Sequence, residues 1–308
     1  MGRWFVALEM LALLSLLSCA NSRQELVQQH LDAAQTAANR QDYSLAAAEL
    51  GEAIQIYPDE QLYELQGDAY QASGNLGGAI NDYTYLIQNY DPSAEYYGQR
   101  SVLYAQSGDF LAGLADAQEM VRIAPNSYTS YMARGFQYEM LDRYDDAIGD
   151  FSHAIGLAPD HASPYLQRGF AYGLMGEYQR AEADFQQALK RDRELPIAYA
   201  ALAWLRATCP VAGLRNGKQA LSDALRACSL DKWSDPLPLA ALAAAHAENG
   251  DFASAVMWQE YAIAKTLSGA APLREQEQRV LAVYRSGKPY HSDFSAVKPA
   301  LVWIPVPV

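Results

Sequence analysis

The amino-acid sequence predicts an all-α protein, a superhelical solenoid of about seven helix-turn-helix units followed by a C-terminal capping helix. The first observation is a tyrosine that recurs every 34 residues, at Tyr63, Tyr97, Tyr131, Tyr165 and Tyr199. The second is another tyrosine seven residues after each of the first four, at Tyr70, Tyr104, Tyr138 and Tyr172. A fixed period of this length is typical of arrays in which each unit packs against its neighbours.

Composition narrows the classes of ligand. The 308-residue chain has a formal net charge of −13 and a pI near 4.8, so phosphate backbones repel it and we expect no nucleic-acid partner. The five histidines are scattered, and no metal site or other cofactor is expected. Three cysteines are too few for a scaffold built on disulfides.

Residues 1–18 have the pattern of an export signal. Arg3 supplies a positive charge, and the apolar run Phe5–Leu17, interrupted by Glu9, is too short to span a membrane as a helix. The ending Leu-Leu-Ser-Cys resembles a bacterial lipobox, which implies cleavage before Cys19 and lipid on that cysteine. Ordinary cleavage after Ala20 and an uncleaved anchor are the alternatives. Residues 19–25 would form a linker.

The lipobox resemblance also implies a location. A lipidated Cys19 would attach the protein to a membrane of the cell envelope. Ala20 differs from the aspartate that retains lipoproteins at the inner membrane, which favours an outer-membrane lipoprotein facing the periplasm. A soluble periplasmic or secreted protein is the alternative.

The helical units occupy residues 26–269. The expected boundaries are 26–59, 60–93, 94–127, 128–161, 162–195, 196–235 and 236–269. The unit at 196–235 is longer because Cys209–Gly217 extends its turn. A capping helix is expected at 272–286, since the open end of a solenoid needs a polar cover, and residues 287–308 should form an extended apolar tail.

This frame of tyrosine, glycine, alanine and proline positions resembles the tetratricopeptide repeat over about 245 residues. One departure is an arginine or glutamine before the glycine, where the family has leucine: Gln66, Arg100, Arg134 and Arg168. The segments Ala207–Cys228 and Tyr284–Tyr290 resemble the C-terminal part of tetratricopeptide proteins of planctomycete-type bacteria.

The family resemblance implies a groove along the inner faces of the first helices. Its apolar positions, which could hold a protein or peptide partner, are Val102, Met132, Phe136, Leu166, Phe170 and Trp204. The alternative is that these side chains pack between helices or lie under the protein's own tail. Nearer the N-terminus the same positions are acidic, with Glu64 and Asp68, so a carboxylate-clamp site is not expected.

Two further sets of residues have open interpretations. Arg100, Arg134 and Arg168 could bind an anion, but pairing with Asp116, Asp150 and Asp184 is favoured. Cys209 and Cys228 would face each other across the expanded hairpin, either as a disulfide or as buried free thiols.

No nucleophile–base set, phosphate-binding loop or metal spacing appears in the sequence, so the protein is not expected to be an enzyme. We expect a non-enzymatic binding scaffold of the bacterial envelope. The alternatives are an assembly factor, resembling a pilotin, for an outer-membrane complex and, less favoured, an envelope hydrolase.

Overall fold

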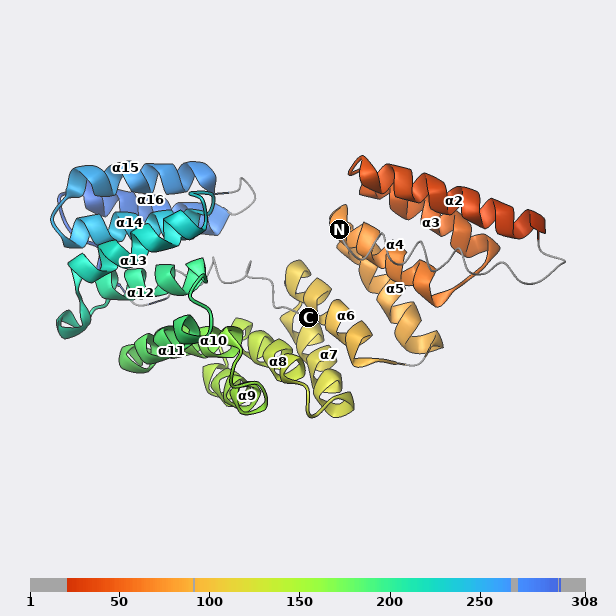
Figure 1. Ribbon diagram of the computed structural model, residues 1–308, viewed down its shortest axis with the longest axis horizontal. Coiled ribbons are helices and arrows are strands. Elements are labelled where there is room, and N and C mark those ends of the chain that lie inside the picture. Colours follow the sequence, from red (N-terminus) through yellow and green to blue (C-terminus); the bar gives the residue numbers. More distant parts are fainter. Residues whose placement is uncertain (1–20, 91, 267–270, 293, 295–308) are drawn as a thin grey trace. The chain divides into compact units, whose positions relative to one another are not determined.

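The computed structural model describes residues 21–90, 92–266, 271–292 and 294. Within them the chain forms fifteen α-helices, one short 3-10 helix and no strand (Figure 1). The all-α prediction is therefore confirmed. The helices group into two compact units, one ending at Asn126 and one beginning at Ser127.

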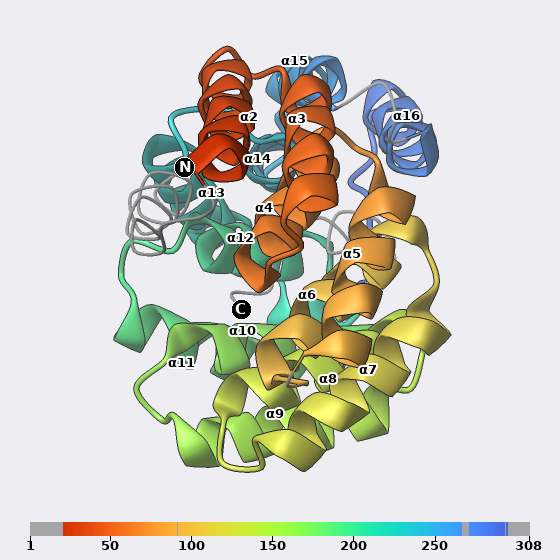
Figure 2. The same cartoon turned by 90° about the vertical axis from the view of Figure 1, so that its right-hand side faces the viewer.

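Unit 1 consists of three helical hairpins. Its helices are α2 (Asn21–Asn39), α3 (Tyr43–Ile56), α4 (Glu60–Ala72), α5 (Leu76–Asn89), α6 (Ala94–Ser107) and α7 (Phe110–Ile123). Figure 2 shows α2 and α3 side by side, and each hairpin packs on the next along the chain. Helix α2 begins at Asn21, so residues 21–25 are helical and not the expected linker. Nothing in Asn21–Glu25 opposes this extension, because the segment contains neither proline nor glycine.

Unit 2 contains four hairpins and the capping helix. Its helices are α8 (Tyr128–Met140), α9 (Tyr144–Leu157), α10 (Ala162–Leu174), α11 (Tyr178–Arg191), α12 (Pro196–Thr208), α13 (Gly217–Leu230), α14 (Pro236–Glu248), α15 (Phe252–Lys265) and α16 (Ala271–Arg285), with the 3-10 turn η1 (Ala212–Leu214) before α13. The seven hairpins and the cap follow the order that the 34-residue period predicts.

Short turns with repeated chemistry separate the two helices of a hairpin. Asp42, Asn75, Asp109 and Asp251 accept a hydrogen bond from the backbone N–H three residues later and so begin α3, α5, α7 and α15. A cap of this kind stabilises a helix by about 1 kcal/mol. One residue before Asn75 and Asp109, the chain turns through Gly74 and Gly108 with φ of 81° and 82°. Glycine reaches this left-handed region without a steric penalty.

Small residues on the first helix of a hairpin match large ones on the second. A Cβ atom placed on Gly135 would lie 2.6 Å from the ring of Phe151, and one on Gly169 would lie 2.7 Å from Phe185. Phe151 and Phe185 are fully buried. The hairpin α6–α7 differs, because Ala117 stands at the position of the phenylalanine and Ser101 at the position of the glycine. The hydroxyl of Ser101 donates to the carbonyl of Gly113. The glycines of the repeat are therefore packing positions.

The arginines before these positions form ion pairs inside their own hairpins. Arg100, Arg134 and Arg168 each hold an aspartate through two guanidinium nitrogens at 2.7–2.9 Å; the partners are Asp116, Asp150 and Asp184. Each guanidinium also lies within 6.0 Å of the ring centroids of the two tyrosines that flank it in the frame. The structural role favoured from the sequence is thus confirmed.

Helix α4 breaks this pattern. It has Gln66 in place of the arginine, and the Gln66 amide donates to the carbonyl of Ala47. The corresponding acid, Asp82, is 8% exposed, and its Oδ2 atom has no hydrogen-bond partner among the described residues. Burial raises the pKa of Asp82 from 3.8 to about 7. Unit 1 therefore contains a buried carboxyl group without the arginine that its equivalents have.

The two cysteines of unit 2 are free thiols in the structure, and both are buried. Burial raises the pKa of Cys209 and raises that of Cys228 to about 12. Of the two alternatives left by the sequence, the free thiols describe this structure. A buried thiol with a raised pKa is unreactive, so these residues contribute packing.

Candidate functional site

Five of the six residues predicted to line an apolar groove lie in unit 2, and all five are buried. Their exposed fractions are 1% for Met132, 7% for Phe136, 4% for Leu166, 1% for Phe170 and 4% for Trp204. Val102 lies on α6 in unit 1 and is half-buried. The open groove expected at the five unit 2 positions is therefore not present in this conformation. Their part in partner binding stays a prediction.

Helix-to-helix packing accounts for one of these residues. Met132 belongs to a core cluster with Phe151 and Ala154 of α9 and Ala171 of α10. Its side chain thus fills the space between successive hairpins, as the alternative interpretation expects.

Phe170 is covered by the protein's own C-terminal segment, whose described residues are 288–292 and 294. The ring of Phe294 lies 6.4 Å from that of Phe170 and 6.0 Å from that of Phe185, with which it stacks. Beneath it, Gly173 leaves room for the ring, because a Cβ atom there would lie 2.8 Å from Phe294. Phe294 is 2% exposed, so a residue far along the chain completes the core around α10 and α11.

Trp204 has an equivalent neighbour from the same segment. The ring of Tyr290 lies 6.3 Å from the indole. Next along the segment, the backbone N–H of Ser292 donates to the carbonyl of Thr208 at 2.9 Å. The indole Nε1 of Trp204 has no hydrogen-bond partner among the described residues. A buried donor left unpaired costs about 1–3 kcal/mol.

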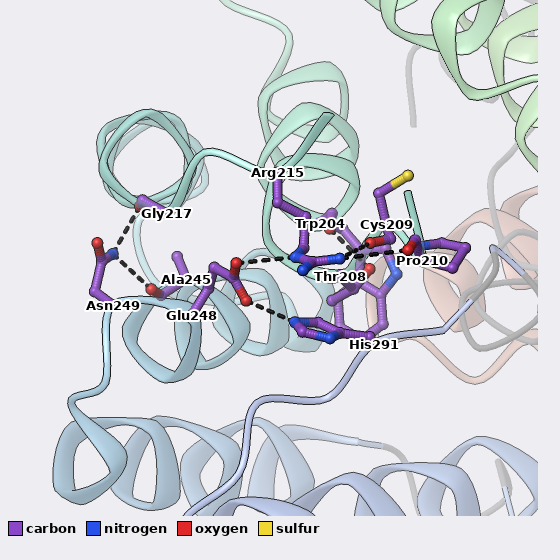
Figure 3. A network of polar contacts seen from close by, with 10 residues as sticks. All are labelled: Trp204, Thr208, Cys209, Pro210, Arg215, Gly217, Ala245, Glu248, Asn249 and His291. Carbon is purple, nitrogen blue, oxygen red and sulfur yellow. Dashed lines mark hydrogen bonds and ion pairs between the residues drawn. The ribbon is translucent and has the colours of Figure 1, made fainter. Parts of the chain in front are cut away.

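An ion-pair chain fixes the polar side of this contact (Figure 3). Glu248, at the end of α14, accepts from Arg215 Nε at 3.0 Å, and its other oxygen lies 2.7 Å from Nε2 of His291. Arg215 also donates to the carbonyl of Cys209 at 2.8 Å, which ties the expanded turn to the same carboxylate. Arg215 therefore helps to hold Glu248 in the position in which it contacts His291.

We call these residues of α10, α12 and α14 the first-helix face: Phe170, Gly173, Trp204, Thr208 and Glu248. They come from the first helices of three successive hairpins, and each contacts the C-terminal segment through Tyr290, His291, Ser292 or Phe294. A stretch of polypeptide that forms neither helix nor strand at residues 288–292 thus lies across the first helices of three successive hairpins.

Comparison with known proteins identifies the architecture. A family model described as the tetratricopeptide repeat matches residues 162–195, the hairpin that carries Phe170 and Gly173. A tetratricopeptide repeat protein from Parabacteroides merdae is 15% identical and superposes with a TM-score of 0.62, over 85% of this chain and 99% of its own. The chain has the fold of a tetratricopeptide-type solenoid.

Two other solved structures are similar over smaller parts of the chain. MamA from Desulfovibrio magneticus RS-1 is 15% identical, with 54% of this chain and 95% of that chain covered and a TM-score of 0.49. YrrB, described as a TPR protein with an unusual peptide-binding site, is 14% identical, with 59% and 94% covered and a TM-score of 0.48. None of the curated proteins matches the chain.

Sequence reasoning missed the residues that complete the first-helix face. Gly173 stands where the neighbouring hairpins have Glu139 and Ala207, so the repeat does not require a glycine there. That departure was the available signal. Glu248 and the pair Tyr290 and Phe294 gave none, because their contacts join segments that no period relates.

The acidic positions of unit 1 are engaged in hydrogen bonds. The hydroxyl of Tyr96 lies 2.5 Å from a carboxylate oxygen of Glu60 and 2.6 Å from one of Glu64, and Tyr83 donates to Asp68 at 2.9 Å. Burial and these acceptors raise the pKa of Tyr96. These acidic positions are thus part of a packed polar layer in unit 1.

Within the described residues, no group of three histidine, cysteine, aspartate or glutamate side chains could hold a metal ion. No helix in the described ranges is long and apolar enough to cross a membrane. Cys19 and the rest of residues 1–20 lie outside those ranges.

Proposed function

We propose that the protein is a non-enzymatic scaffold of the bacterial cell envelope that holds a protein or peptide partner on the first-helix face of unit 2. One observation carries this proposal: the face already holds a piece of polypeptide from the protein's own C-terminal segment. Tyr290 and Phe294 bring their rings to it, and Ser292 gives it a backbone hydrogen bond.

These contacts are of the kind that recognise a peptide. Aromatic anchors in closely packed surroundings often dominate the free energy of binding. A main-chain hydrogen bond and the Glu248–His291 pair fix the direction of the chain. Glu248 is oriented by Arg215, and a site on preorganised helices loses little entropy when it binds.

The envelope location is part of the proposal and rests on the sequence of residues 1–20. Lipid on Cys19 would anchor the protein to a membrane, with the outer membrane favoured. Mass spectrometry of the mature N-terminus tests this directly. A diacylglyceryl-modified Cys19 is expected, and a mature chain that starts after Ala20 without lipid would contradict the anchor.

Photo-crosslinking in intact cells tests the partner site. We place a benzophenone side chain at Leu174, next to Gly173, and as a control at Gly149, an exposed position on α9 where no atom lies within 4 Å of the added Cβ. A specific adduct from position 174 that is absent at position 149 is expected. Equal adducts at both positions would contradict the site. An adduct with an outer-membrane barrel or a secretin would assign the scaffold to assembly of that complex.

A further inference from the structure

We infer that the described residues of the C-terminal segment, 288–292 and 294, are an intramolecular ligand of the first-helix face, and that the face takes external peptides of the same pattern. That pattern is an aromatic residue, a histidine or cationic residue directly after it, and a second aromatic residue four positions after the first. The inference rests on the proposed function and specifies its partner class and its regulation.

The second aromatic residue of the pattern occupies a pocket in the hairpin α10–α11. The equivalent hairpins on either side of it do not form this pocket. Gly173 forms its floor, and Phe170 and Phe185 form its walls. Since the corresponding residues Glu139 and Ala207 carry side chains, the space under Phe294 is a feature of α10 and not of the repeat. An aromatic ring fits it, because the ring of Phe294 stacks on Phe185 with an interplanar angle of 22°.

The first aromatic position lies against α12. Tyr290 is half-buried beside Trp204, and its hydroxyl accepts from the side-chain amide of Gln276 on α16 at 3.0 Å. A tyrosine therefore suits this position better than phenylalanine, because the hydroxyl has a partner ready.

At the position of His291, directly after the first aromatic residue, the charge of Glu248 determines which side chains are favoured. Glu248 presents one carboxylate oxygen to His291, while Arg215 holds the other. A donor or a cation is favoured there, and an acidic residue would place two carboxylates together. The backbone of the next residue is used as well, through the Ser292 N–H and the carbonyl of Thr208.

Several features mark the segment as exchangeable. Residues 288–292 form neither helix nor strand, and Phe294 lies in a 3-10 turn, so no α-helix or strand is broken when these residues leave the face. The hairpins α10–α11 and α12–α13 each pack through their own two helices. The indole N–H of Trp204, in a side chain 4% exposed, has no partner among the described residues while the segment is in place. A peptide that offers an acceptor there would satisfy a group that the segment leaves unpaired.

The covalent connection makes this segment a strong competitor. A short linker gives a tethered ligand an effective concentration on the order of millimolar. Residues Ser286 and Gly287 alone separate the segment from α16. External peptides that bind weakly are therefore excluded, and a partner must exceed the tethered segment in affinity before it is held.

A labelled peptide provides the test. The probe is fluorescein-labelled Ser-Gly-Lys-Pro-Tyr-His-Ser-Asp-Phe, the sequence of residues 286–294, and fluorescence anisotropy measures its binding to the full chain. A double variant, Tyr290→Ala with Phe294→Ala, should bind the probe at least about tenfold more tightly than the unmodified protein, because the competitor has lost both anchors. A probe with alanine at both aromatic positions should not bind.

The pocket is tested in the same background. Adding Gly173→Ala to the double variant should weaken binding of the probe by about tenfold, because a methyl group enters the space that the probe's phenylalanine ring would occupy. Adding Gly149→Ala makes the same chemical change at an exposed position of α9 and should leave affinity unchanged. Far-UV circular dichroism and the melting temperature show that each variant is folded.

Three results would overturn the inference. A folded double variant that does not bind the probe would show the segment to be a fixed part of the fold. Equal affinity of the double variant and the unmodified protein would show that the segment does not compete. A dimer that the double variant abolishes would show that the segment belongs on a second copy. If crosslinking at position 174 still captures a partner after such a result, the proposed function survives; if both experiments fail, it fails too.

Discussion

At the scale of single residues, the repeat shows its structural logic most clearly where one residue breaks it. Asp82 occupies the position of Asp116, Asp150 and Asp184 but has Gln66 opposite in place of an arginine. Its carboxyl group is buried and forms no ion pair with any described residue, and burial raises its pKa to about 7. Removing a charge from water without a partner is costly, so the neutral acid is favoured in the folded protein.

This pKa predicts how stability depends on pH. The folded state binds the proton on Asp82 more tightly than the unfolded chain, where the pKa is 3.8. The contribution of this bound proton to the free energy of unfolding is therefore complete below the unfolded pKa. It is lost as pH rises through the folded pKa of about 7. The difference in free energy of unfolding between Asp82→Asn and the unmodified protein should grow by about 2–3 kcal/mol from pH 5 to pH 8, in favour of the variant.

Urea unfolding at a series of pH values measures this difference. The matched control is Asp116→Asn, which leaves Arg100 without its partner. The control should lower the free energy of unfolding across the whole range, because it breaks a pair that is mostly buried. A difference between Asp82→Asn and the unmodified protein that does not change with pH would contradict the raised pKa.

Restoring the arginine should have a related effect. In Gln66→Arg the guanidinium would stand between Tyr63 and Tyr70, as Arg100 stands between Tyr97 and Tyr104, and could reach Asp82. We expect the pKa of Asp82 to fall well below 7, which carbon-detected NMR of the carboxyl group measures. Gln66→Lys should lower it less, since an ammonium group cannot form the two parallel bonds of a guanidinium. An unchanged pKa in the arginine variant would show that the pair does not form.

At the scale of helices and hairpins, size matching between the first and second helix holds each hairpin together. Gly135 and Gly149 provide a matched pair of tests in the hairpin α8–α9. Gly135→Ala places a methyl group 2.6 Å from the Phe151 ring, and we expect it to lower the free energy of unfolding. Overpacking of this kind costs about 1–3 kcal/mol, which exceeds the gain in helix propensity.

Gly149→Ala should have the opposite sign. Its Cβ meets no atom within 4 Å, so the gain of about 0.5–1 kcal/mol in helix propensity remains. Equilibrium urea unfolding of both variants measures the two values. A Gly135→Ala variant as stable as Gly149→Ala would show that Phe151 can move aside, and that close packing does not require the repeat glycine.

The same scale shows what the sequence can predict. The period predicts the succession of helical hairpins, because Tyr131, Gly135 and Phe151 report local packing that recurs, with substitutions, in the regular units. It also predicts that Met132 and Phe170 lie on first helices, but it does not predict whether their side chains are exposed or buried. Met132 is covered by the next hairpin, and Phe170 by Phe294, which lies 124 residues further along the chain (294 minus 170). Such a long-range contact leaves no periodic trace.

At the scale of the whole molecule, the two units have separate cores. The buried clusters around Leu50 and Tyr83 contain residues of unit 1 alone, and those around Phe151 and Phe185 contain residues of unit 2 alone. Stability in a repeat protein is approximately a sum over units and the interfaces between neighbours. Each unit is therefore expected to have its own free energy of unfolding, and substitutions at Asp82 and at Gly135 change the values of unit 1 and unit 2 respectively.

Hydrogen exchange, read helix by helix, tests this expectation. Asp82→Asn at pH 8 should increase amide protection in α4 and α5 and leave α14 and α15 unchanged, because substitutions at distant sites act independently. Gly135→Ala should reduce protection in α8 and α9 and leave α2 and α3 unchanged. A uniform change across all helices in either variant would mean that the chain opens as one cooperative body. In that case a partner bound to the first-helix face would stabilise unit 1 as strongly as unit 2; with separate units, the added protection stays within unit 2.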